Sequence, residues 1–202
     1  MTSTEPRADR PDPSSSARSG RAMGPLVGAV FGVVWCAIGV AGVHGRHAGA
    51  VRVAAVLAAA AVLVTVLVAG RRAVRVPVAV RRAESPAPRP GFVPLIVVQA
   101  VLIGVGCGLL NGALGRPRLV FAWTALVVGA HFFPLSRTFR TPGLRVLGGA
   151  MVLLALVTGF VVLLVPDEPE GLWQWLPGLG TAALVWLAAL LPVLRPSPQP
   201  TT

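Results

Sequence analysis

Residues 92–114 read FVPLIVVQAVLIGVGCGLLNGAL, an apolar run without a single charged side chain. An α-helix needs about 20 such residues to cross the roughly 30 Å hydrocarbon core of a bilayer. Backbone polar groups inside hydrocarbon must be satisfied within the protein, and a helix satisfies them within its own segment. This stretch therefore predicts a transmembrane helix.

Five more stretches of the chain have the same length and character. They are residues 24–43, 50–69, 119–135, 144–165 and 172–194. The chain of 202 residues is 54% hydrophobic and 12% charged, whereas soluble domains carry about 25% charged residues. The predicted fold class is all-α, a polytopic transmembrane bundle of six helices, with the transmembrane domain covering residues 23–195.

Both ends of the chain differ from this domain. Residues 1–22 are rich in proline, serine and arginine and show no apolar periodicity, which predicts a disordered tail. They are not a secretory signal, because the apolar run after them spans about 20 residues where a signal has 7–15. Residues 196–202 contain three prolines and predict a second tail.

The arginines set the orientation. All 18 basic residues are arginine, and fourteen lie on the side of the N-terminal tail against four on the other. Positive charge marks cytoplasmic loops, so both termini are predicted to be cytoplasmic. The short connections 44–49, 115–118 and 166–171 then face outward, and the spans pair into three hairpins. The lysine-free, Ala-, Gly-, Val- and Pro-rich composition indicates a high-GC bacterium, hence its inner membrane.

The net charge of +11 is explained by this topology, so no nucleic-acid partner is expected. The expected partner is the lipid bilayer, and small residues at intervals of four leave a homodimer or another membrane protein open as well. These ridges are Gly24, Gly28, Gly32 and Cys36; Ala100, Gly104, Gly108 and Gly112; and Ala125 with Gly129. They predict close helix packing.

The spans lack most residue types that carry chemistry. All seven acidic residues lie outside them, which disfavours a pump coupled through an intramembrane carboxylate. No catalytic or nucleotide-binding fingerprint occurs, so no enzyme activity and no cofactor are predicted. Cys36 with Cys107, and His44 with His47, fall short of a metal site, and none is predicted.

The candidate intramembrane polar site is the pair Gln99 and His131. His131 is the one ionisable residue well inside a span, and Gln99 lies at a similar depth in the preceding span. A hydrogen bond between them would satisfy both groups and lock the hairpin. The alternative is a substrate or proton path. Pro134 predicts a kink beside His131.

The stretch from His131 to Leu135, His-Phe-Phe-Pro-Leu, followed by Arg137 and Arg140, resembles small uncharacterised six-helix membrane proteins of high-GC actinobacteria. That resemblance implies the same architecture and no activity. The residues favour an integral membrane protein with a structural or accessory role. A small transporter or channel with a site near Gln99 and His131 is the alternative.

Overall fold

The computed structural model describes residues 13–73, 92–165 and 169–194, and within them the chain is all-helical. Six of the described helices are long and apolar enough to cross a membrane, which confirms the predicted fold class. They are α1 (Pro13–Ala41), α2 (Ala48–Ala73), α4 (Phe92–Asn111), α5 (Val120–Thr138), α6 (Gly143–Leu164) and α7 (Leu172–Leu194). A single 3-10 turn, η1 (Pro117–Leu119), precedes α5.

Helix bounds follow the predicted spans closely, and α1 differs most. It begins at Pro13, inside the segment predicted to be disordered, although its membrane-crossing part is Gly24–Ala41. Proline suits the first position of a helix, and the alanines and arginines that follow are good helix formers. The predictions for residues 1–12, for most of the basic connection 70–91 and for the C-terminal tail lie outside the described residues.

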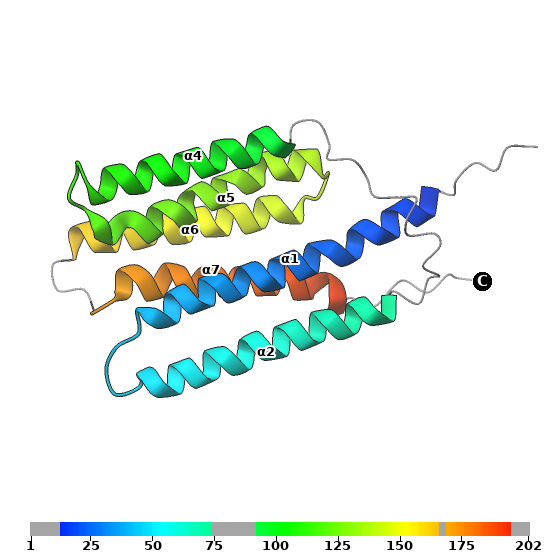
Figure 1. The fold of residues 1–202 in the computed structure, drawn as a ribbon, viewed down its shortest axis with the longest axis horizontal. Helices are drawn as coiled ribbons and strands as arrows, with labels where there is room; N and C mark the ends of the chain where they lie inside the picture. Colours follow the sequence, from blue (N-terminus) through cyan, green and yellow to red (C-terminus); the bar gives the residue numbers. More distant parts are fainter. Residues whose placement is uncertain (1–12, 74–91, 166–168, 195–202) are drawn as a thin grey trace, which may run out of the picture.

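The helices lie side by side as long antiparallel rods (Figure 1). The α1–α2 and α4–α5 connections lie at one end, together with the end of α6 and the start of α7. The α5–α6 turn and the start of α1 lie at the other end, as three hairpins require. The most extensive contacts nevertheless join α1 to α7 and α5 to α6. Each of these pairs links two different hairpins, so the hairpins are held together at the centre of the bundle.

Glycines bring α1 and α7 together. A Cβ at Gly39 would lie 2.5 Å from the backbone nitrogen of Leu179, so only glycine fits there. Two side chains of α7 also donate hydrogen bonds to backbone carbonyls of α1: Trp186 Nε1 to Ala29 at 3.1 Å, and Gln174 Nε2 to Ile38 at 3.1 Å. Small residues and interhelical hydrogen bonds are the two devices that join helices in lipid.

A second glycine contact joins α5 to α6. Ala125 is fully buried, and a Cβ at Gly129 would lie 3.0 Å from the carbonyl oxygen of Gly148. Two of the predicted ridges, those of α1 and α5, therefore serve close packing. The exception is Gly24 at the end of the α1 ridge, where an added Cβ would meet nothing within 4 Å.

The ridge of small residues on α4 does not serve close packing within the described chain. Among residues 93–111, Gly106 alone is buried, whereas Ala100, Gly104 and Gly108 are exposed. Within the described chain α4 is attached through Gly106, which lies beneath the Trp123 ring, and through a 3.0 Å hydrogen bond from Trp123 Nε1 to Leu102. Within the described chain α5 covers the Gly106 face instead, so close packing at this ridge stays a prediction, with a homodimer or another membrane protein as the open partners.

Candidate functional site

Gln99 and His131 lie on the adjacent, antiparallel helices α4 and α5, and both are half-buried. The register is fixed nearby by the contact between Cys107 Sγ and Thr124 Oγ1 at 3.7 Å. Gln99 is eight residues from Cys107, and His131 is seven residues from Thr124, in the same direction. The two therefore share a level in the bundle, while the described residues record no hydrogen bond between them.

Two cavities are described, and neither is lined by Gln99 or His131. One lies at the α5–α6 turn and the other at the opposite end of the bundle, between the α1–α2 turn and α7.

The first cavity has a volume of about 370 Å³ and is lined by Ser136, Arg137, Arg140, Pro142 and Arg145. We call this set the arginine pocket. In the sequence its three arginines serve as orientation signals, and Arg137 and Arg140 also carry the family resemblance, but their convergence on one cavity was not predicted. The missed signal is three arginines around one short turn between two apolar spans.

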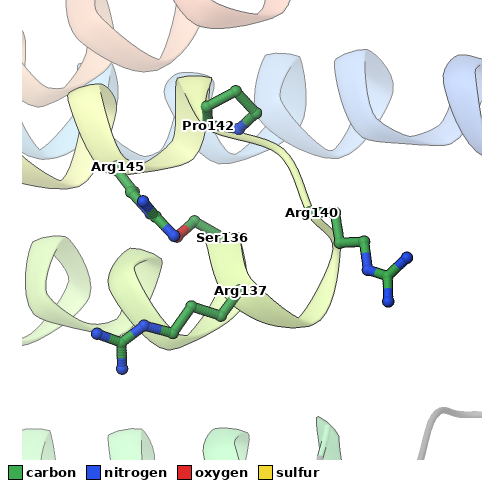
Figure 2. Close-up of a pocket in the computed structure, with 5 residues that line it drawn as sticks. All are labelled: Ser136, Arg137, Arg140, Pro142 and Arg145. Atoms are coloured by element: carbon green, nitrogen blue, oxygen red, sulfur yellow. The ribbon is translucent and has the colours of Figure 1, made fainter.

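Ser136 and Arg145 form the centre of the arginine pocket. Arg145 Nε donates a hydrogen bond to Ser136 Oγ at 3.1 Å, and this hydroxyl donates in turn to the carbonyl of Phe133 at 2.7 Å. Ser136 is 2% exposed. In Figure 2 the Arg145 side chain points at Ser136, while those of Arg137 and Arg140 point away on different sides. A buried hydroxyl thus fixes one guanidinium at the mouth of the cavity.

Arg140 has an unusual backbone. Its φ is +52°, and it is the one non-glycine residue with positive φ in the described part of the chain. The Arg140 N–H bonds to the Arg137 carbonyl, and the Thr141 N–H bonds to the Ser136 carbonyl. This is the Schellman ending of α5, in which glycine usually holds the left-handed position. An arginine there costs about 1–2 kcal/mol relative to ordinary helical backbone.

No acidic side chain neutralises the arginine pocket within the described residues. Glu170 is the one acidic residue described, and it lies just before α7, at the far end of α6. The 22 residues of α6 span about 33 Å. Among the described residues, the three arginines of the pocket therefore have no acidic partner.

The second cavity, of about 460 Å³, has a largely apolar wall, which His44 and Glu170 also line. His44 Nδ1 lies 2.9 Å from the carbonyl oxygen of Gly42, and His47 Nε2 accepts a hydrogen bond from Arg46 Nε at 2.9 Å. The two histidines thus have separate local partners. The described residues contain no group of three or more His, Cys, Asp or Glu side chains that could hold a metal ion.

The two cysteines are both free, Cys36 buried in the core on α1 and Cys107 half-buried on α4. The chain matches no family model, and comparisons with curated proteins and with solved structures found no match. The sequence and the helices together describe a multi-pass membrane protein.

Proposed function

We propose that the chain is a non-enzymatic protein of the bacterial inner membrane with a structural or accessory role. The observation that carries this proposal is the α1–α7 contact, in which a Cβ at Gly39 would meet backbone of α7. Backbones this close leave no room for a polar path between these two central helices. The apolar core around Trp35, Met151 and Trp186 supports the same conclusion.

The orientation with both termini in the cytoplasm rests on the arginine distribution, fourteen against four. It is tested with single cysteines in a background in which Cys36 and Cys107 are replaced by alanine. In right-side-out vesicles, an impermeant maleimide should label Arg46→Cys and spare Arg140→Cys. The reverse pattern would invert the assigned orientation.

A small transporter is the second candidate, because Gln99 and His131 share a level on two neighbouring helices. The same cysteine-free background separates the two functions. For a structural or accessory protein, Gln99→Cys and His131→Cys should resist the maleimide from both sides of the membrane, with Arg46→Cys as the labelled control. Labelling of both positions from one side would favour transport.

An accessory role also predicts a partner. Extraction of the tagged full-length protein in a mild detergent should recover a second membrane protein in fixed proportion. Because high-stringency detergent disrupts weak helix contacts, the same preparation in a harsh detergent is the matched control. Recovery of the chain alone under both conditions would contradict the accessory role.

A further inference from the structure

We propose that the arginine pocket binds a phosphate group, either of an anionic lipid headgroup or of a soluble phosphate compound. This inference goes beyond the proposed function and does not depend on it. It rests on four observations at one place. They are a cavity, three arginines that line it, a buried Ser136 hydroxyl that holds Arg145, and the strained backbone of Arg140.

Arg145 supplies the anchoring donors. A guanidinium has five N–H donors in a planar fork that matches the oxygens of a phosphate. The described contacts use its Nε for Ser136 and leave the two terminal nitrogens for a ligand. Because Ser136 is buried and bonded on both sides, the fork is held before the ligand arrives, which lowers the entropy lost on binding.

Arg137 and Arg140 lie on either side of this anchor. Their side chains point outward (Figure 2), and both are exposed. Exposed side chains change rotamer within nanoseconds, so both guanidinium groups can turn toward an anion at Arg145. In the described part of the chain these three positive charges have no acidic neighbour. They therefore favour a ligand with at least one full negative charge.

The backbone at Arg140 provides an independent argument. Strained conformations persist where the surrounding structure or a function maintains them, and they gather at binding sites. Glycine would make the same Schellman ending without strain. An arginine at this position places a long cationic side chain beside the cavity at a cost in stability.

The position of the arginine pocket fits a phosphate at the membrane surface. Ser136 lies in the last turn of α5, and Arg145 in the first turn of α6. The pocket is therefore level with the ends of two apolar spans, where lipid headgroups lie. A cavity of about 370 Å³ is at the small end of ligand sites, which suits a headgroup or a small phosphate compound.

The lipid source is tested by native mass spectrometry of the full-length protein. The protein is released from micelles that contain equal amounts of phosphatidylglycerol and phosphatidylcholine, two phosphodiesters of which only the first has a net charge. The proposal predicts preferential retention of phosphatidylglycerol. The soluble source is tested by equilibrium dialysis of the delipidated protein against radiolabelled inorganic phosphate.

Retention of phosphatidylglycerol without phosphate binding identifies a lipid site, and the reverse result identifies a soluble ligand. Binding of neither probe overturns the proposal. Arg145→Gln should weaken whichever ligand binds by about fivefold to tenfold, since one charge-assisted hydrogen-bonding group is lost. The matched control is Arg71→Gln on α2, which removes the same charge at the same end of the bundle, outside the arginine pocket.

Two further variants separate geometry from net charge. Ser136→Ala keeps every charge and should still weaken binding about threefold, because Arg145 loses its fixed orientation. Arg140→Gly should weaken binding while leaving the fold intact, since glycine suits the left-handed backbone. If Arg71→Gln weakened binding as much as Arg145→Gln, or if Ser136→Ala had no effect in a folded protein, surface charge alone would explain binding and the site would be refuted.

Discussion

Helices α1 and α4 both carry a ridge of small residues at intervals of four. Within the described chain, only the ridge on α1 packs against another helix. On α1, Gly28 and Gly32 lie against α7, and the close contact continues through Gly39. On α4, a Cβ at Gly104 or Gly108 would have no atom of another helix within 4 Å. The spacing therefore predicts a face that permits close approach, and the facing helix decides whether the approach occurs.

The complementary helix explains the difference. α7 offers α1 a matching row of small residues, among them Gly178, Ala182 and Ala189, together with Trp186 as a hydrogen-bond donor. α5 offers α4 the Trp123 ring over Gly106, on another face of the helix. Lipid does not drive helices together as water does, so van der Waals fit and a few hydrogen bonds determine the pairing.

A large residue introduced on each ridge tests this difference in packing with the largest expected effect. Gly39→Leu should destabilise the protein by about 3 kcal/mol or prevent folding, because the added atoms meet backbone that cannot move aside. Gly104→Leu should change the free energy of unfolding by less than about 0.5 kcal/mol. Reversible denaturation in mixed micelles, followed by circular dichroism, measures both. Equal losses would mean that the α4 ridge is also packed.

The two tryptophans give a milder version of the same test. Trp186→Phe removes a buried hydrogen bond and leaves a small void, for an expected loss of about 1–2 kcal/mol. Trp123→Phe at the half-exposed α4–α5 contact should cost less than about 1 kcal/mol. The denaturation midpoints of the two variants provide the comparison, and a larger loss for Trp123→Phe would contradict the central role of α1–α7.

Two buried threonines in the core differ in their hydrogen bonding. In the described residues Thr181 Oγ1 on α7 is buried without a hydrogen-bond partner, whereas Thr158 Oγ1 on α6 donates to Leu154 at 2.8 Å. Thr181→Val should therefore stabilise the protein by about 1 kcal/mol, because an unpaired buried hydroxyl is removed. Thr158→Val should destabilise it slightly. A loss for Thr181→Val would show that its hydroxyl has a partner in the membrane.

The smallest expected effect is at the α5–α6 turn. Arg140→Gly should raise the free energy of unfolding by roughly 0.5–1 kcal/mol, since it relieves the left-handed backbone at φ +52°. Thermal unfolding monitored by circular dichroism would report the change, with Arg137→Gly as the control that removes an equal charge from a helical position and should destabilise. Destabilisation by both variants would remove the argument from strain.

The six spans and the three hairpins could be predicted from the sequence, because hydrocarbon thickness and arginine asymmetry act on each segment locally. The pairing of α1 with α7 could not, since it depends on the shapes of faces far apart in the chain. The level shared by Gln99 and His131 follows from residue counting along one hairpin, and their role stays a prediction. The arginine pocket was missed because three arginines at a turn are already explained by orientation.

The central claim, that α1 packs directly on α7, is tested most directly by disulfide cross-linking. A Cβ at Gly28 would lie 3.3 Å from Cβ of Ala189, close to the 3.5–4.5 Å of a disulfide. In the background that lacks Cys36 and Cys107, Gly28→Cys with Ala189→Cys should form an intramolecular disulfide under mild oxidation, and Gly104→Cys with Ala189→Cys should not. Absence of the first cross-link in a folded protein, or formation of the second within one chain, would contradict the account.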